Sequence, residues 1–243
     1  MASGIANNNP EVNIRKAEVF DIPQIIDFTR NTFSWGDYLP NVINEWVRAG
    51  TAYVAVAHNE VVGVINIELL PTGVTWLEGL RVKPSHRRIG VGTALTKFVM
   101  DHARRAGAKY AMLMIAEWNE ASHNLAHKLG FKPVLRVHAG IAKESSTIRE
   151  TNPERIREVI RQALDITGGY LCTGNGHWIC TRATIDYALS LIKEVYVGDK
   201  GVGFDIGFSI GLPTTPVKME VLSTDYGDFD KYYGVYIVYE LRL

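Results

Sequence analysis

The chain lacks several features that would narrow its class. Its 243 residues include only two cysteines, Cys172 and Cys180, too few and too widely spaced for a zinc site. Lysine plus arginine equals aspartate plus glutamate, 26 of each, so charge favours neither nucleic acid nor an anionic membrane as a partner. No apolar run approaches the length that spans a bilayer. Residues 1–12 are polar, without the apolar core of a secretion signal, and we expect a flexible N-terminus.

What the chain does contain indicates a globular protein. Hydrophobic residues make up 47% and charged residues 21%, which is typical of a soluble protein with a sizeable core. The length exceeds the usual size of a single domain, so one large or two modest domains are expected. We expect a cytoplasmic protein, and in that compartment reduced, partly buried thiols are the favoured interpretation of the two cysteines. A disulfide between them is the alternative.

Periodicity predicts alternating strands and helices in the first part of the chain. Three consecutive β-rich segments joined by short turns predict an antiparallel meander, which a parallel Rossmann sheet lacks. The expected order is β-α-α-β-β-β-α-β-α-β, at about residues 13–18, 21–33, 41–48, 51–57, 61–70, 74–82, 91–106, 109–116, 119–129 and 131–141.

The pattern restarts after a polar stretch, and we place a domain boundary near residue 145. This predicts a main domain at 13–144 and a smaller C-terminal α+β domain at 145–243. In the second domain we expect helices at about 153–168 and 183–195, with short strands between them and three β-rich segments at the end. The segment 173–177 is predicted to be a hairpin turn rather than a second phosphate loop. A diverged, shortened copy of the first part is one interpretation of this domain.

One glycine-rich turn carries the most information about function. Arg87-Arg88-Ile89-Gly90-Val91-Gly92 follows a predicted strand and opens a predicted helix. The glycines let the backbone turn tightly and expose its N–H groups, and these donors together with the helix dipole form an anion site. The two arginines add fixed positive charge, which suits a phosphate-bearing ligand.

Four features, in order along the chain, resemble the GCN5-related N-acetyltransferase (GNAT) superfamily over about residues 13–142. A shorter likeness at 78–82 is to histidine N-acetyltransferase-like members. The four features are the Arg-x-x-Gly-x-Gly loop at Arg87, Gly90 and Gly92, the preceding strand end Leu80-Arg81-Val82 with Pro84, the run Asn119, Ala121 and Leu125, and the helix ending Leu129-Gly130-Phe131.

The resemblance implies an α/β (α+β) fold with a mixed, mostly antiparallel sheet, flanked by helices, whose strands ending at Val82 and Ile115 splay apart. It also implies acetyl-CoA as the cofactor, with the pantetheine arm pairing along a strand edge. A backbone N–H of Leu80 or Val82 is then the expected oxyanion donor. The implied cofactor-binding residues are Leu80, Arg81, Val82, Arg87, Arg88, Ile89, Gly90, Val91, Gly92, Thr93, Asn119 and Ser122.

Acetyl transfer to an amine needs a base for the amine and an acid for the departing thiolate. In the family a tyrosine commonly supplies the acid, but here that position is Ala126, and His123 is the replacement candidate or else a solvated helix residue. Glu78 is the first candidate base and Glu117 the second, with Glu68 a weaker third. Glu78 could instead orient the substrate or be structural, and Glu117 could cap the helix that follows it.

Acceptor recognition is expected in the loop between the first two helices, as in relatives. Trp35, Asp37 and Tyr38 could hold a cationic amine through charge and cation–π contact, or the two aromatic residues could simply pack the loop onto the sheet. No metal is expected, because the acidic stretch at 225–230 lacks the spacing of a calcium loop.

These expectations combine into one functional hypothesis with a rival. The first is an acetyl-CoA-dependent N-acetyltransferase that acts on a primary amine, a small molecule or amino acid, by direct transfer in a ternary complex. The second domain would form one wall of the acceptor site. We expect no nucleic-acid or membrane partner, and a homodimer is left open. The rival is a catalytically weak acyl-CoA-binding sensor, favoured by Ala126.

Overall fold

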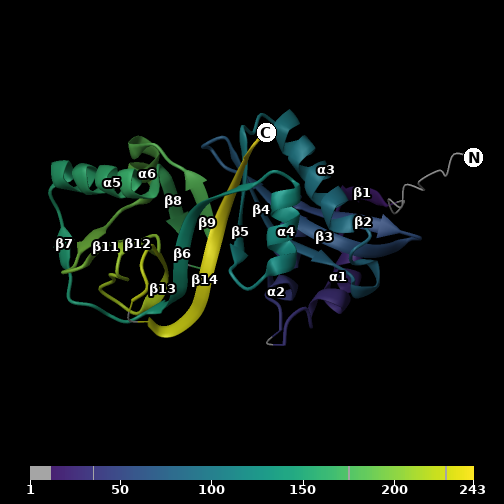
Figure 1. Cartoon of the computed structure of the whole chain (residues 1–243), viewed down its shortest axis with the longest axis horizontal. Coiled ribbons are helices and arrows are strands. Elements are labelled where there is room, and N and C mark those ends of the chain that lie inside the picture. The colour runs from purple at the N-terminus through teal and green to yellow at the C-terminus, as the bar shows by residue number, and fades with distance from the viewer. Residues whose placement is uncertain (1–11, 35, 175, 228) are drawn as a thin grey trace, which may run out of the picture. The chain divides into compact units, whose positions relative to one another are not determined.

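The computed structural model describes residues 12–34, 36–174, 176–227 and 229–243. Its first part has the predicted order of elements (Figure 1). Among the described residues, none of the helices has the length and apolar character that crossing a bilayer requires. The elements are β1 (Asn13–Lys16), α1 (Ile22–Thr29), α2 (Leu39–Ala49), β2 (Ala52–Ala57), β3 (Glu60–Leu69), β4 (Val74–Val82), α3 (Val91–Arg105), β5 (Tyr110–Ala116), α4 (Glu120–Lys128) and β6 (Lys132–Ala142).

Strands and helices also follow one another in the second part of the chain, but one helix is shorter than predicted. The helix expected at 183–195 ends at Leu191, because Ile192 is already extended and Val195 begins a strand that pairs on both sides. The elements are β7 (Ile148–Glu150), α5 (Pro153–Thr167), β8 (Tyr170–Thr173), β9 (Ile179–Arg182), α6 (Ile185–Leu191), β10 (Val195–Val197), β11 (Gly201–Phe204), β12 (Phe208–Gly211), β13 (Met219–Ser223) and β14 (Phe229–Arg242).

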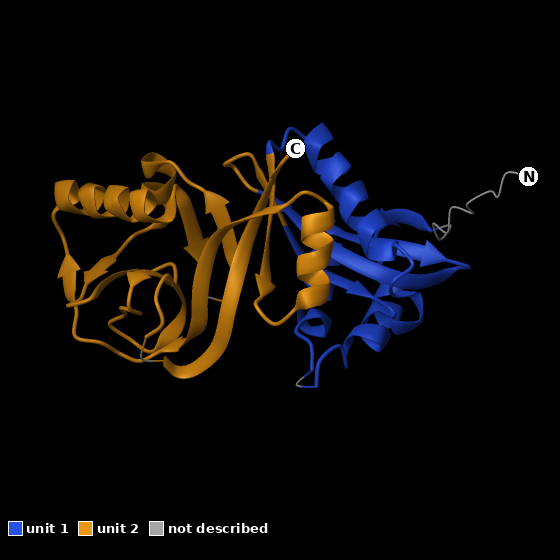
Figure 2. Cartoon of the chain, in the orientation of Figure 1, with its two compact units in different colours: residues 1–69, 77–109, 243 blue, residues 70–76, 110–242 orange. Residues whose placement is uncertain are grey.

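The chain divides into two compact units (Figure 2). The first unit consists of residues 1–69, 77–109 and 243, and the second of residues 70–76 and 110–242. Strand β4 contributes to both units, since its first residues belong to the second unit and the remainder to the first. The division into compact units falls at residues 70, 77 and 110.

The first unit is built on strands in the order β1-β2-β3-β4. Strands β1 and β2 are antiparallel, as are β2 and β3. Helix α2 buries Leu39, Ile43 and Trp46, which recur at the spacing of one helix face, and it ends at Gly50 in the left-handed conformation. These side chains pack with Ile25 of α1 and with apolar residues of the strands, so the core lies between helices and sheet.

A glycine in β4 fits this packing. Gly79 has a φ of +64°, and a Cβ added there would lie 2.7 Å from atoms of the Trp46 ring. Both the backbone conformation and the close approach exclude a larger side chain. Helix α2 thereby packs directly on the β4 backbone, at the residue after Glu78.

In the second unit the last strand lies between β5 and β6. Strand β14 is antiparallel to both, with Tyr110 opposite Arg242 and Lys132 opposite Glu240. Residues 143–228 therefore form the connection between two neighbouring strands, β6 and β14. Strand β14 thus ties β5 and β6 to the second half of the chain. The strand order continues β6-β13-β12-β11-β10-β7.

The two cysteines form a disulfide. Cys172 of β8 lies directly opposite Cys180 of β9 in the antiparallel pair, and their Cα atoms are 4.0 Å apart. Both residues are fully buried in the core of the second unit, beneath the apolar face of α5 formed by Val159, Ile160 and Ala163. The prediction of reduced thiols is thus wrong for this structure, because strand pairing sets the two side chains against each other. The hairpin prediction for the segment that joins β8 to β9 is confirmed for its described residues.

Candidate active site

The glycine-rich turn lies between β4 and α3 in the first unit. Arg88 adopts a φ of +64°, which is unusual for a residue with a side chain, and Gly90 at the N-cap of α3 has a φ of +97°. Successive N–H groups in such a turn point to one side and form an anion-binding concavity. The N-cap of α3 is Gly90, which has no side chain to cap the first N–H groups of this helix.

The residues of this turn lie at the surface, and the helix that follows is anchored by a buried side chain. Arg87, Arg88 and Ile89 are exposed, whereas Val91 is fully buried and fixes the helix on the sheet. Arg87 Nε donates a hydrogen bond of 3.0 Å to the carbonyl oxygen of Val82, which ties the turn to the end of β4. The predicted residues at 87–93 therefore form one continuous turn and helix start, with positive charge at its rim.

Strand β4 offers a strand edge beside this turn. Within the first unit it is the outermost strand, and its pairing with β5 is confined to Val74–Trp76 opposite Tyr110–Met112. The predicted cofactor residues Leu80, Arg81 and Val82 lie beyond that paired stretch. The Leu80 carbonyl accepts a 3.0 Å hydrogen bond from Arg81 Nη1.

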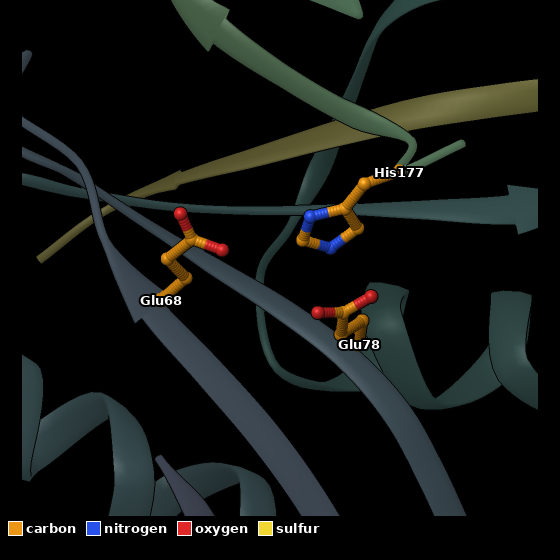
Figure 3. Close-up of side chains that lie close together, drawn as sticks. All are labelled: Glu68, Glu78 and His177. Carbon is orange, nitrogen blue, oxygen red and sulfur yellow. The ribbon is translucent and has the colours of Figure 1, made fainter. Parts of the chain in front are cut away.

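Glu78, the first candidate base, lies on β4 with polar neighbours from β3. Its Oε1 accepts a hydrogen bond of 2.9 Å from Nδ2 of Asn66. The carboxylate of Glu68, also on β3, lies within 4.8 Å of that of Glu78. Figure 3 shows the two carboxylates on these neighbouring strands. Glu68 is the third candidate base; Asn66, which no sequence motif marks, lies on the same face of β3 because side chains alternate along a strand.

The loop before α2 uses its predicted acceptor-binding residues internally. The Asp37 carboxylate is fully buried and bonds Arg81 at two points, with Nε–Oδ2 at 2.6 Å and Nη2–Oδ1 at 3.1 Å. It also accepts a hydrogen bond of 3.1 Å from the backbone N–H of Leu39. Its charge is thus neutralised by Arg81, and Asp37 holds the loop to β4. Trp35 lies outside the described residues.

Tyr38 places its hydroxyl near Glu78. The residue as a whole is 46% exposed, but its hydroxyl is buried, and burial is the main reason that the pKa of Tyr38 is raised far above its ordinary value. The charge of Arg81 and a hydrogen bond with the backbone of Gly79 oppose the rise in the pKa, while Glu78 adds to it. Tyr38 therefore stays protonated at neutral pH beside β4.

In the second unit, the candidate acid His123 is hydrogen-bonded to a tyrosine, Tyr239. His123 Nε2 lies 3.2 Å from the carbonyl oxygens of Ala116 and Glu117, so in a neutral ring Nε2 carries the proton. Nδ1 then accepts from the Tyr239 hydroxyl at 2.8 Å. Tyr239 lies on β14, 4% exposed, and thus supplies a phenol to helix α4, whose Ala126 is buried. No motif marks Tyr239, since only the pairing of β14 brings it there.

Glu117, the second candidate base, belongs to a chain of polar side chains in the second unit. It accepts a hydrogen bond of 3.1 Å from Arg136 Nη2, and both side chains are more than half exposed. Arg136 Nη1 lies 3.3 Å from His138 Nε2, and His138 Nδ1 lies 2.8 Å from the Tyr232 hydroxyl. Because arginine only donates, Nε2 accepts and Nδ1 donates to Tyr232. Burial, followed by Arg136, lowers the pKa of His138.

The start of α4 is capped by the side chain of Asn119, whereas the sequence had offered Glu117 for this role. Asn119 Oδ1 accepts a hydrogen bond of 3.2 Å from the backbone N–H of Ser122. This cap is a structural role for Asn119, and its predicted role toward the cofactor stays a prediction. The same holds for Ser122.

The family comparison agrees with this geometry. Residues 20–131 match the acetyltransferase (GNAT) family. That span runs from the start of α1 to the end of α4 and contains the turn at 87–92, β4 and Glu78. Through this segment, which is just under half of the chain, the protein is similar to the GNAT acetyltransferases.

Individual relatives match a shorter part of the chain. The acetyl transferase GW6a of Oryza sativa subsp. japonica is 43% identical over 61 residues, which cover 25% of this chain and 15% of the relative. HLS1 of Arabidopsis thaliana, described as a probable N-acetyltransferase, is 39% identical over 59 residues, 24% of this chain and 15% of the relative. The chain thus spans about 15% of the length of these two relatives.

A solved structure matches nearly the whole chain. A Thermoplasma acidophilum protein classed as an acetyltransferase superposes with a TM-score of 0.60 and 17% identity, covering 96% of this chain and all of that one. At this identity the likeness establishes the fold alone. The expected fold class, a mixed α/β sheet flanked by helices, is confirmed.

Proposed function

We propose that the protein is an acetyl-CoA-dependent N-acetyltransferase that transfers the acetyl group directly to a primary amine, a small molecule or amino acid. The observation that carries the proposal is the turn at Arg87–Gly92, where Arg88 and Gly90 have positive φ angles at the open N-terminus of α3. This geometry suits a diphosphate, which acetyl-CoA carries.

Each part of the cofactor has a matching feature in the first unit. The N–H groups of the turn and the charges of Arg87 and Arg88 would hold the diphosphate. The outer edge of β4 at 80–82 would pair with the amides of the pantetheine arm, as an added strand does. When bound, acetyl-CoA supplies an acetyl group activated as a thioester.

The residues of the chain would manage the protons of the acceptor. The amine nitrogen forms a bond to the acetyl carbon as the carbon–sulfur bond breaks, and an amine that enters as the ammonium loses two protons in all. One proton goes to a base, for which Glu78 is the candidate, and the other to the departing sulfur. His123, in its hydrogen bond with Tyr239, stays the candidate for the second step.

A pair of glycine substitutions tests the cofactor assignment. Gly90 and Gly107 lie just outside opposite ends of α3, and both have positive φ angles, +97° and +95°. Alanine strains the backbone at either position, but only Gly90→Ala alters the proposed diphosphate turn. We expect Gly90→Ala to weaken CoA binding at least tenfold in calorimetry and Gly107→Ala to leave it within twofold. Equal affinities in the two variants would remove the assignment.

The sensor remains the second candidate, favoured by the buried Ala126 where the family commonly has a tyrosine. Release of free thiol from acetyl-CoA across a panel of primary alkylamines, methylamine to n-hexylamine, and amino acids separates the two. Amine-dependent release supports the enzyme. Tight CoA binding without release on any acceptor supports the sensor.

A further inference from the structure

The outer edge of β4 presents two backbone carbonyls, those of Leu80 and Val82. The N–H of Lys83 donates a hydrogen bond of 2.9 Å to the Val62 carbonyl of β3. The Val82 carbonyl belongs to the same trans peptide unit, in which the C=O points opposite to the N–H. Val82 therefore turns its carbonyl away from β3. The Leu80 carbonyl faces the same way, because the backbone groups of a strand alternate.

Each of these carbonyls accepts a hydrogen bond of 3.0 Å from an arginine, but the two arginines are held differently. Arg81 bonds Leu80 through Nη1 and is fixed by its two bonds to the buried carboxylate of Asp37. Arg87 is exposed to water, and within the described part of the chain its side chain has only the bond from Nε to Val82. An exposed side chain with one hydrogen bond is released far more easily than a buried ion pair. Arg87 is therefore the arginine that can move.

The proposed function gives both partners of this bond a second role. Arg87 lies in the turn assigned to the diphosphate, and Val82 lies on the edge assigned to the amides of the pantetheine arm. An amide N–H of the arm that pairs with this edge needs the carbonyl that Arg87 occupies here. The released guanidinium, in turn, has several N–H donors that suit a phosphate.

We propose that Arg87 is a gate that couples the two ends of the cofactor. In the free protein it covers the Val82 carbonyl, and it turns to the diphosphate when the pantetheine arm takes that carbonyl. This inference rests on the proposed function and concerns how the same site selects its ligand. The selected ligand carries a diphosphate and an amide arm in one molecule. Arg87 is thus a specificity-determining residue against thioesters without a diphosphate and nucleotides without an amide arm.

The coupling follows from how often the bond between Arg87 and Val82 is broken. Pantetheine alone breaks it and gives Arg87 no new partner. The other half of CoA, adenosine 3′-phosphate 5′-diphosphate, breaks it to gain Arg87 and leaves Val82 to water. When both halves bind, the bond is broken once rather than twice, so each half raises the affinity for the other. The net contribution of one hydrogen bond sets this effect at about threefold to tenfold in affinity.

Titration with the two halves of CoA tests the gate. In the unaltered protein we expect saturating adenosine 3′-phosphate 5′-diphosphate to raise the affinity for pantetheine about threefold to tenfold, measured by NMR titration. In Arg87→Ala the Val82 carbonyl is open from the start. Pantetheine alone should therefore bind this variant about threefold to tenfold more tightly than it binds the unaltered protein, and the nucleotide should no longer raise its affinity.

Arg88→Ala is the matched control. Arg88 is the next residue in the turn, is also exposed, and makes no hydrogen bond to β4 among the residues that the structure describes. This variant should weaken binding of the nucleotide. The affinity for pantetheine alone should stay within about twofold, and saturating nucleotide should still raise it. Because Arg87 is at the surface, Arg87→Ala should keep the free energy of unfolding of the unaltered protein, which urea denaturation checks.

The outcomes separate the gate from the proposed function. Equal affinities for pantetheine in the unaltered protein and Arg87→Ala, including no binding to either, overturn the gate and leave the N-acetyltransferase standing. An enhancement by the nucleotide that survives in Arg87→Ala does the same. Equal affinities are also the result expected if Nε of Arg87 stays on Val82 while its other nitrogens hold the diphosphate. Absence of binding of intact CoA to the unaltered protein removes both proposals.

Discussion

Each unit of the molecule contains an arginine that bonds a carboxylate at two points and packs on aromatic rings. In the first unit Arg81 pairs with Asp37, and its guanidinium lies 5.1 Å from the Phe33 ring centre and 5.6 Å from that of Tyr38. In the second unit Arg182 pairs with Glu240 at 2.6 Å and packs on Tyr110 and Tyr170.

The two pairs differ in burial. The side chains of Asp37 and Arg81 are 0% and 16% exposed, whereas those of Glu240 and Arg182 are 11% and 42% exposed. Both pairs join segments that are distant in the sequence: a loop to β4 in the first unit, and β9 to β14 in the second. Each arginine–carboxylate pair thus fixes a contact between distant segments. If the carboxylate is removed, water has better access to the remaining arginine in the second unit than in the first.

The largest effect is expected from breaking the buried pair. Asp37→Ala leaves Arg81 charged and poorly hydrated, and we expect a loss of about 3–5 kcal/mol in the free energy of unfolding, measured by urea denaturation. Replacing both residues, with Arg81→Met added, should recover part of this loss. A loss below about 1 kcal/mol for Asp37→Ala would show that the pair behaves like a surface salt bridge.

A smaller effect is expected in the second unit. Glu240→Ala leaves Arg182 with access to water, so we expect a loss of about 1–3 kcal/mol, between the values for exposed and buried pairs. Hydrogen exchange should locate the loosened region at β9 and β14. If the two units respond equally to loss of their carboxylates, burial is not what distinguishes the pairs.

The smallest effect is expected from pH, again in the second unit. Because the pKa of His138 is lowered from 6.5 by folding, the unfolded chain binds more protons just below pH 6.5. The free energy of unfolding should therefore fall as the pH falls from 6.5, with increased hydrogen exchange around β6 and β14. His138→Gln should flatten this dependence. An equally steep loss in that variant would place the responsible group elsewhere.

Local pattern was enough to predict the first part of the fold. Strands β2, β3 and β4 follow one another through short turns, so alternation and turn residues reveal both the strands and their neighbours. The turn at 87–92 was predicted for the same reason, since strand, glycines and helix are contiguous. The role of Asp37 could not be predicted in this way, because its carboxylate pairs with Arg81, a residue far along the chain.

The second unit was harder to predict because its decisive contacts are long-range. Strand β14 was recognised as β-rich, but no local signal places it between β5 and β6. The pairing of Cys172 with Cys180 and the approach of Tyr239 to His123 depend on strand pairing in the same way. Asn66 could have been found from alternation along β3 beside Glu68.

The position of β14 also affects how the protein is made. Strands β5 and β6 leave the ribosome with a gap between them that only residues 229–242 fill. Until those residues are synthesised, both strands have unpaired backbone edges that are prone to aggregation. Folding of the whole sheet therefore waits for residues 229–242, and a chain that stops before them lacks the strand that joins β5 to β6.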